Sequence, residues 1–423
     1  MTLRGWADIL MRASAPADIV GLHVKDTLAA FLAGSRTSEG RGLARTCRAG
    51  ADRADVAALV SAIARLSECD DIHLASCITP GAVVIPTALA FADNAGADKA
   101  GAAQFNCAIA AGYAAGIALG TSIGGARALT RGIWPTLFAA PVMAAVTASC
   151  VRGYDAERLA SALSSALTAS TEHTGALQGT TRWALLAQAI AKGIRASDAT
   201  DAGSPRVDGI DIQMRRGPSW SASVFESAPA LSEVEGPALS ETGFKPFPIA
   251  RQCASAVVAF QRLLAKGVDA TRIDSIDVFV PEVHMALVTR PLSAADRLTR
   301  LCNIGFQLAC AARAPESLYD PERAASPALA EFAARVTVLP AKDFDTDLPS
   351  RWPARVVVTT GTERFEETVV NAPFDHDAAD LPQLLAGKWR RLGVEEELAA
   401  LSVTSDPWPL VAGYARSAAH QVT

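Results

Sequence analysis

One segment of the sequence brings together several side chains that can carry acid–base chemistry. Glu68-Cys-Asp-Asp-Ile-His-Leu-Ala-Ser-Cys-Ile-Thr-Pro-Gly-Ala82 contains three carboxylates, one histidine and two thiols within fifteen positions. The flanking stretches are rich in alanine, and a carboxylate in such surroundings must be hydrogen-bonded, solvated at a cleft or shifted in pKa. Acid–base catalysts have these properties. We therefore predict that Glu68, Asp71 and His73 are catalytic.

A structural role remains open for each of these residues. The carboxylates of Glu68, Asp70 and Asp71 can cap a helix or connect two helices through hydrogen bonds. His73 can serve as acid or base, or can be buried with its hydrogen bonds satisfied. Cys77 lies near this histidine, which suits a thiolate nucleophile, but cysteine is commonly just a small buried residue.

Alanine-rich helices are expected to position this segment. From residue 3 to about residue 195, apolar residues recur at intervals of three and four, and the alternation typical of strands is missing. Gly34 is the expected C-cap of the first long helix. The stretch 102–120 is very apolar, but its Ala, Gly, Gln104 and Asn106 favour a tightly packed helix of a soluble core over a membrane span. The predicted helices are 18–33, 55–66, 97–119, 133–150 and 156–169.

Strands are predicted only in the second half of the chain. Period-two alternation indicates strands at 273–280 and 335–339, and a hairpin at 354–371 that turns at Gly361-Thr362. Helices are expected among them at 251–266, 294–313 and 380–392. The fold class predicted is therefore mostly α, with a large helical domain over 1–243, to which 394–423 returns, and a smaller α+β lid over 244–393. The sequence Pro-Ala-Leu-Ser-Glu occurs twice between 227 and 241, which predicts a surface insertion there.

The composition excludes several classes of function. The chain has 423 residues, half of them hydrophobic, a net charge of -5 and no basic tract, which argues against nucleic acid as a partner. Its eight cysteines form no CxxC pair and no zinc spacing, so we expect no metal and reduced thiols in a cytoplasmic protein. The glycines at 120–125 follow no strand, as a dinucleotide fold would require, and no cofactor is expected. We expect no membrane partner either.

Several fragments, taken in order, resemble the MmgE/PrpD family, which includes methylcitrate dehydratase, cis-aconitate decarboxylase and iminodisuccinate epimerase. The resemblance covers essentially the whole chain. It implies a helical domain with an α+β lid, an active site between them, a small carboxylate substrate and a homodimer. The matching fragments are Lys25-Asp-Thr-Leu-Ala-Ala-Phe-Leu-Ala-Gly34, Glu68-Cys-Asp-Asp-Ile-His73, Thr79-Pro-Gly-Ala82, Gly132-Ile-Trp-Pro-Thr136, Lys245-Pro-Phe-Pro-Ile-Ala-Arg-Gln-Cys-Ala254 and Lys388-Trp-Arg-Arg-Leu392.

The chain departs from the family pattern at positions that handle protons. Thr79, Trp134 and Ala254 stand where the family has histidines, and Ile72 stands where it has a threonine. Arg182 falls near the position of the family's lysine, and an arginine can clamp a carboxylate but cannot titrate as a base. The residues that we predict to bind substrate are Asp70, Thr79, Trp134, Arg182, Lys245 and Arg251.

Two of these assignments have open alternatives. Lys245 and Arg251 can bind an anionic substrate or can be solvated surface residues. Trp134 and Trp183 can line an apolar pocket or can fill the volume left by lost histidines.

Two functions are compatible with the sequence. The first is a cofactor-independent lyase or isomerase that abstracts a proton from a small carboxylated substrate in a cleft between the helical domain and the lid. The second is a family member without catalytic activity, which acts as a binding or assembly subunit. Convergence of Glu68, Asp71, His73 and Arg182 would favour the enzyme.

Overall fold

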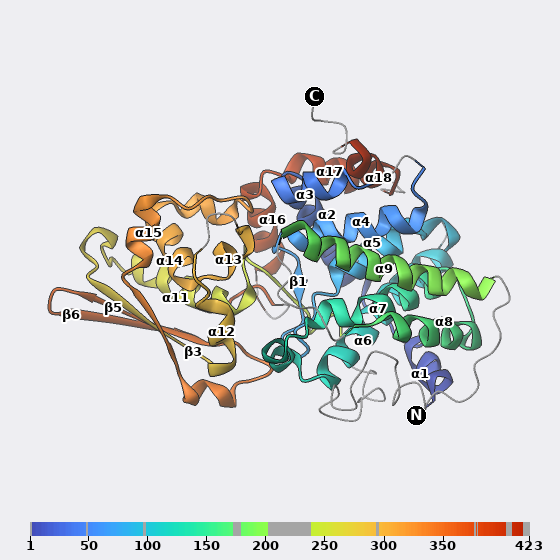
Figure 1. The fold of residues 1–423 in the computed structure, drawn as a ribbon, viewed down its shortest axis with the longest axis horizontal. Helices are drawn as coiled ribbons and strands as arrows, with labels where there is room; N and C mark the ends of the chain where they lie inside the picture. Colours follow the sequence, from blue (N-terminus) through green and yellow to red (C-terminus); the bar gives the residue numbers. More distant parts are fainter. Residues whose placement is uncertain are drawn as a thin grey trace. The chain divides into compact units, whose positions relative to one another are not determined.

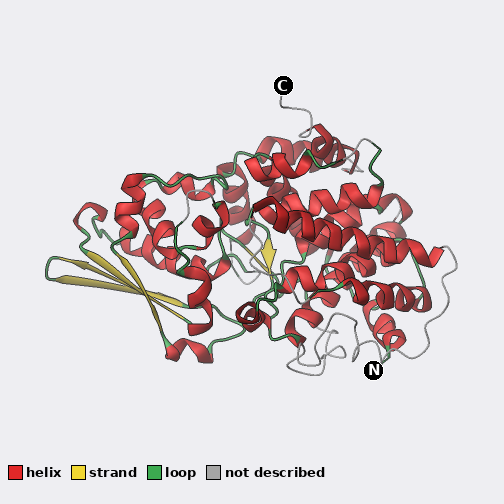
Figure 2. Cartoon of the chain, viewed as in Figure 1, coloured by secondary structure: helices red, strands yellow, loops and turns green. Residues whose placement is uncertain are grey.

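The computed structural model describes residues 2–417 except 48–49, 96–98, 172–178, 202–237, 293–295, 376–377, 379 and 403–407. The described chain is mostly helical with one small mixed sheet, which confirms the predicted fold class (Figure 2). It divides into two compact units, Met1–Gly243 with Val394–Thr423, and Phe244–Gly393. The predicted insertion at 227–241 lies, up to residue 237, outside the described residues.

The first unit, called here the helical unit, consists of helices packed side by side (Figure 1). Its described residues include one short strand, β1 (Asp71–Ile72), and β2 (Gly243–Phe244) lies at its boundary. Its helices are α1 (Leu3–Leu10), α2 (Ala17–Ser35), α3 (Ser38–Ala44), α4 (Arg53–Leu66), α5 (Gly81–Ala90), η1 (Ala92–Asn94), α6 (Lys99–Ser122), η2 (Gly125–Arg131), α7 (Pro135–Val151), α8 (Ala156–Ala169), α9 (Gly179–Asp201), α17 (Glu395–Ser402) and α18 (Trp408–Ser417).

Small residues let the central helices α6 and α7 approach closely. A Cβ at Gly112 would lie 2.2 Å from Thr147 Oγ1, and a Cβ at Gly116 would lie 2.3 Å from Met143 Sδ. Helix α6 is long and apolar enough to cross a membrane by length and composition, but 61% of that apolar window is buried inside the protein. Its sequence of Ala and Gly is therefore used for helix packing, as predicted.

The last helices of the chain complete the helical unit. Helix α17 packs on α2 and α18 packs on α4, and Arg36 forms an ion pair with Glu397. Gly34 was expected to cap α2, but the helix continues to Ser35 and this glycine is not left-handed. A Cβ at Gly34 would lie 2.1 Å from the carbonyl oxygen of Ile63, so the glycine is required by the approach of α4.

The second unit, called here the α+β unit, contains a four-stranded sheet in the order β4-β3-β5-β6. Strand β3 pairs in parallel with β4 and antiparallel with β5, and the β5–β6 hairpin turns at Gly361, as predicted. Helices α11 and α14 pack on this sheet (Figure 1). The elements are α11 (Arg251–Ala265), η3 (Ala270–Arg272), β3 (Ser275–Val280), η4 (Glu282–His284), α12 (Met285–Val288), α13 (Arg297–Cys302), α14 (Ile304–Arg313), η5 (Pro315–Tyr319), α15 (Pro327–Ala333), β4 (Val336–Pro340), η6 (Lys342–Thr346), β5 (Ala354–Thr360), β6 (Glu363–Val369) and α16 (Leu381–Arg391).

One predicted helix is divided in two. The stretch 294–313 was expected to be continuous, but α13 ends at Cys302 and α14 begins at Ile304. Asn303 lies between them in an extended conformation, and its side-chain oxygen accepts a hydrogen bond from the backbone N–H of Phe306 at 2.8 Å. This N-cap starts a new helix and redirects the chain.

Candidate functional site

The acidic segment that follows α4 is a strained, folded-back loop. Glu68 and Cys77 both adopt left-handed backbone conformations, with φ of 58° and 54°, which non-glycine residues rarely adopt. The two arms of the loop meet where His73 N donates to Ile78 O at 2.8 Å. Strained conformations persist only where surrounding contacts impose them, and they concentrate at functional sites.

Asp71 lies at the centre of a buried hydrogen-bond network. Its Oδ1 accepts from Gly81 N at 2.9 Å, and its Oδ2 accepts from Tyr113 OH at 2.5 Å and lies 2.9 Å from His23 Nδ1. Burial, and then the Asp71 charge, raise the pKa of Tyr113 well above its usual value, so the phenol remains a donor. A Cβ at Gly81 would lie 2.6 Å from Asp71 Oδ2, which explains the glycine of the Thr-Pro-Gly turn. These contacts join β1, α2, α5 and α6 and suit a structural carboxylate.

Glu68 and Asp70 instead lie on either side of Arg65, a cation that was not among the predicted site residues. Arg65 Nη1 lies 2.8 Å from Glu68 Oε1 and 3.5 Å from Asp70 Oδ1, and all three side chains are buried. Burial alone would lower the pKa of the Arg65 guanidinium, but the charges of Asp70 and Glu68 outweigh it and raise that pKa. A charged residue in the apolar run of α4, three positions before Glu68, is the sequence signal that could have identified Arg65.

Two tryptophans and a second arginine complete this cluster. The guanidinium carbon of Arg182 lies 3.8 Å from the centroid of the Trp134 ring, and that of Arg65 lies 5.5 Å from the same ring. Trp134 and Trp183 meet edge to face, with centroids 5.8 Å apart. The structure therefore brings Glu68, Asp70, Trp134 and Arg182 together around Arg65. Both tryptophans are buried, which agrees with the volume-filling alternative.

His73 belongs to a separate set of contacts. Its Nδ1 accepts from Ser76 N at 3.3 Å and lies 2.9 Å from Ser76 Oγ, so the neutral ring carries its proton on Nε2. Burial lowers the pKa of His73 to about 4. The Nε2 atom lies 3.8 Å from Oε2 of Glu241. Near neutral pH this imidazole can donate one proton from Nε2 but carries no charge.

Thr79 connects two of the motifs. Its backbone N–H donates to Thr136 Oγ1 at 3.2 Å, and the two hydroxyl oxygens lie 3.1 Å apart. The Thr-Pro-Gly turn is thereby held against the start of α7, where Trp134 stands. Glu68, Asp71 and His73, predicted together as catalytic, thus occupy three distinct environments within one loop. Of these three residues, only Glu68 lies in the cluster that contains Arg182, so the full convergence that would favour an enzyme is not found.

The α+β unit buries an excess of positive charge. Arg251 Nη2 donates to Ala372 O at 3.0 Å and lies 3.3 Å from Asp375 Oδ1, and burial lowers the pKa of this arginine while Asp375 opposes the effect. Among the residues of this unit that the structure describes, no aspartate or glutamate is buried. Lys245 and Arg251 are both buried, so the alternative that they are solvated surface residues is wrong. The buried cations are Lys245, Arg251, Arg297, Arg300, Arg323 and Lys388.

Within the described ranges, no group of three or more His, Cys, Asp or Glu side chains could hold a metal ion. The cysteines are free thiols, and Cys77 is buried.

Fold and site together define a protein with a helical unit that carries buried carboxylates and an α+β unit that carries buried cations. Family models match both parts: the MmgE/PrpD N-terminal domain over residues 17–205 and the MmgE/PrpD C-terminal domain over residues 247–395. The chain belongs to the MmgE/PrpD family, which confirms the resemblance seen in the sequence. Membership suggests dehydratase- or lyase-like activity. No curated protein is similar enough to count as a match.

Proposed function

We propose that the protein is a cofactor-independent lyase or isomerase that abstracts a proton from a small carboxylated substrate. The cluster of charged side chains around Glu68 in the helical unit carries this proposal. It contains two guanidinium groups beside the carboxylate: that of Arg65 lies 2.8 Å from Glu68 Oε1, and that of Arg182 lies over the Trp134 ring that Arg65 also faces. Fixed guanidinium groups can hold the carboxylate of a substrate.

Glu68 is the base in this proposal. Its carboxylate lies beside Arg65 on a strained backbone, and Arg182 stacks on Trp134 within the same cluster. A positioned carboxylate can remove a proton next to a carbonyl or carboxylate group, while fixed cations stabilise the negative charge that develops. His73 is the proposed hydrogen-bond donor through Nε2. Asp71 holds the loop in place, because its oxygens are already engaged with Gly81, Tyr113 and His23.

Proton exchange tests the proposal directly. The purified protein is incubated in deuterated water with citrate, methylcitrate, aconitate and itaconate, and proton NMR follows the C–H signals. We expect one compound to lose a specific signal, and Glu68→Gln to slow that loss at least about 100-fold. Glu363→Gln, which alters an exposed carboxylate of β6, is the matched control and should exchange at the wild-type rate. Exchange by Glu68→Gln at the wild-type rate would remove Glu68 from the chemistry.

The second candidate function is a binding subunit that retains the site without the reaction. The edge-to-face packing of the buried Trp134 and Trp183 favours it, because these rings fill volume beside Arg65, the partner of Glu68, that a substrate would need. The same spectra separate the two functions. Line broadening of a carboxylate without loss of any C–H signal would support the binding subunit and contradict the enzyme.

A further inference from the structure

We infer that Asp70 sets the strength of Glu68 as a base, because the two carboxylates share one guanidinium group, that of Arg65. In the proposed function, on which this inference rests, Glu68 removes a proton from the substrate. Asp70 was predicted to bind substrate. Here it is instead a positioning residue, which acts on the base through Arg65 and does not touch the substrate.

One nitrogen atom of Arg65 faces both carboxylates. Nη1 lies 2.8 Å from Glu68 Oε1 and 3.5 Å from Asp70 Oδ1. Because both oxygens approach the same nitrogen, the two negative charges lie close to each other as well as to the cation. Arg65 is 7% exposed, Glu68 4% and Asp70 0%, so water screens these charges only weakly.

The surroundings of Arg65 keep its positive charge in place. Burial lowers the pKa of this guanidinium, but the charges of Asp70 and then Glu68 raise it by more, so Arg65 remains a cation. The rings of Trp134 and Trp183 have their centroids 5.5 Å and 5.9 Å from the guanidinium carbon, which favours a cation there. Arg65 therefore divides a fixed charge between two carboxylates.

This sharing has a direct consequence for the chemistry of Glu68. A carboxylate that has a guanidinium to itself holds its negative charge tightly and is a weak base, whereas a second negative charge nearby favours the uptake of a proton. Asp70 supplies that second charge and also draws on Arg65. Glu68 is therefore a stronger base than an ion pair with Arg65 alone would allow, which suits proton abstraction near neutral pH.

Other charged and titratable groups adjoin this cluster. Thiols and phenols are ordinarily protonated below about pH 7, and arginine stays charged throughout. Burial lowers the pKa of His73 to about 4, and this residue is the same in every variant below. A change in the titration of Glu68 between about pH 4 and pH 7 therefore reports on the residue that is replaced. The adjoining groups among the described residues are Arg182 of α9, Tyr113 of α6, and Asp71, His73 and Cys77 of the loop.

The titration of Glu68 can be measured directly by ¹³C NMR on the full chain. The protein is labelled at the side-chain carboxyl carbon of glutamate, and the signal of Glu68 is the one missing from Glu68→Gln. We expect Asp70→Asn to lower the titration midpoint of Glu68 by about one pH unit or more, because a negative charge beside it is removed. An unchanged midpoint would overturn the inference. A wild-type Glu68 that stays ionised down to about pH 4, where a free glutamate is more than half protonated, would overturn it too.

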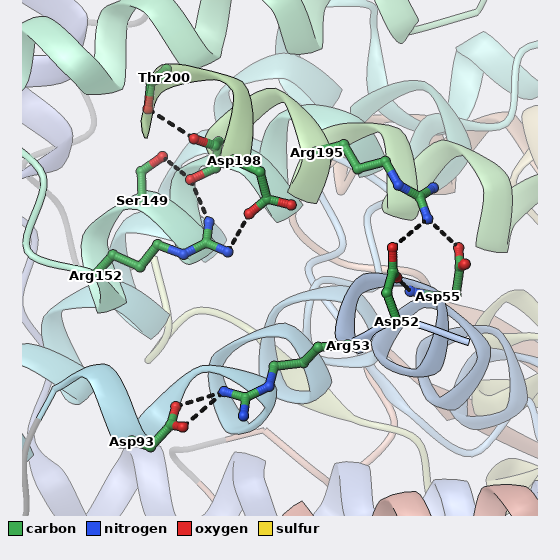
Figure 3. A network of polar contacts seen from close by, with 10 residues as sticks. Asp52, Arg53, Asp55, Asp93, Ser149, Arg152, Arg195, Asp198 and Thr200 are labelled. Carbon is green, nitrogen blue, oxygen red and sulfur yellow. Dashed lines mark hydrogen bonds and ion pairs between the residues drawn. The ribbon is translucent and has the colours of Figure 1, made fainter. Parts of the chain in front are cut away.

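Three further variants make the result specific. Asp70→Glu keeps the charge and should return the midpoint toward the wild-type value. Asp70→Ser removes the charge with a smaller side chain, and it provides the same test if the amide cannot be accommodated. Asp198→Asn is the matched control, because Asp198 pairs with Arg152 in a separate network of the helical unit (Figure 3). A shift of Glu68 in this control as large as in Asp70→Asn would contradict a specific role of Asp70.

The proton-exchange assay separates the inference from the proposed function. Asp70→Asn should exchange the substrate C–H about three- to tenfold more slowly than the wild type near neutral pH, because a weaker base removes the proton more slowly. Circular dichroism shows that each variant is folded. Absence of exchange in the wild type would contradict the proposed function, while the midpoint of Glu68 in Asp70→Asn would still confirm or overturn the inference.

Discussion

Asp71 is a carboxylate that could act as a base, but its contacts give it a structural role. Its two oxygens are within hydrogen-bonding distance of a backbone N–H, a phenol and an imidazole, all buried. An unsatisfied buried donor costs about 1–3 kcal/mol. The identity of these partners decides what a substitution does to stability.

Asp71→Asn is expected to lower the free energy of unfolding by about 1–3 kcal/mol, because an amide nitrogen cannot accept the proton that Tyr113 or Gly81 donates. Urea denaturation measures the change. The double variant with Tyr113→Phe should lose less than the sum of the single variants, since the partners share one network. Asp18→Asn, at an exposed position in the first turn of α2, is the control and should change stability by no more than about 1 kcal/mol. A loss in Asp71→Asn as small as in this control would contradict the structural role.

His284 of the α+β unit gives a second prediction at the residue scale. It is buried edge to face against Trp352, with ring centroids 5.0 Å apart, and neither ring nitrogen has a hydrogen-bond partner among the described residues. Burial lowers its pKa from 6.5 to about 3. Because the folded-state pKa is the lower one, the unfolded chain binds the proton first as the pH falls. Stability that is complete above pH 6.5 is therefore lost progressively down to about pH 3.

His284→Phe should remove this dependence while preserving the ring contact. At pH 5 the wild type should have lost about 2 kcal/mol to this one histidine, relative to pH 7. Urea titrations of both proteins at pH 7 and pH 5 give the comparison. His73 adds a similar loss in both, because its lowered pKa is unaffected by the variant. Equal losses in the two proteins would show that His284 is not the group responsible.

The sequence identified the loop that carries Glu68, but not how its side chains separate. Neighbours in a folded-back loop point to different partners, and those partners come from α2, α4, α6 and α7. His23 and Tyr113 could not be found because each lies in an ordinary apolar helical pattern, far along the chain from Asp71. Their contact is created by helix packing, which local pattern does not encode.

At the scale of elements, the helical unit depends on close approach between helices. Gly193 of α9 faces α7, where a Cβ would lie 2.1 Å from the carbonyl oxygen of Pro141. A backbone atom cannot move aside without moving its helix. Gly21 of α2 has nothing within 4 Å of the corresponding position.

These two glycines form a matched pair for Gly→Ala substitution in helices. Gly193→Ala should destabilise the protein by about 1–3 kcal/mol through overpacking. Gly21→Ala should stabilise it by about 0.5–1 kcal/mol, because alanine favours the helix and loses less backbone entropy. Thermal unfolding of the two variants should move the midpoint in opposite directions. A shift of the same sign would contradict the packing argument.

The local sequence pattern predicted most of these elements. It was wrong where contacts between residues far apart in the sequence determine the structure. The strands β3, β5 and β6 were predicted because alternation and a glycine turn are local signals. Gly34 was interpreted as a cap, whereas its real requirement comes from Ile63 on another helix. The division of 294–313 at Asn303 was missed because the apolar period continues across it.

At the scale of the whole molecule, the two units differ in the charge that they bury. Among the residues that the structure describes, the helical unit buries four carboxylates and one arginine, and the buried charges of the α+β unit are all cations. Net charge and composition gave no sign of this difference, because exposed residues balance it. The family resemblance did predict the family and the fold class, since it rests on the order of several motifs along the chain.

The helical unit is completed by α17 and α18, which follow the α+β unit in the sequence. During translation, α2 and α4 are therefore synthesised several hundred residues before α17 and α18, which cover them. Synthesis proceeds at about 5–20 residues per second. During that interval the apolar faces that later receive Val411, Ala412 and Ala415 remain uncovered. The nascent chain thus has a window in which chaperones, or a neighbouring copy of the same chain, can occupy the place of its own C-terminus.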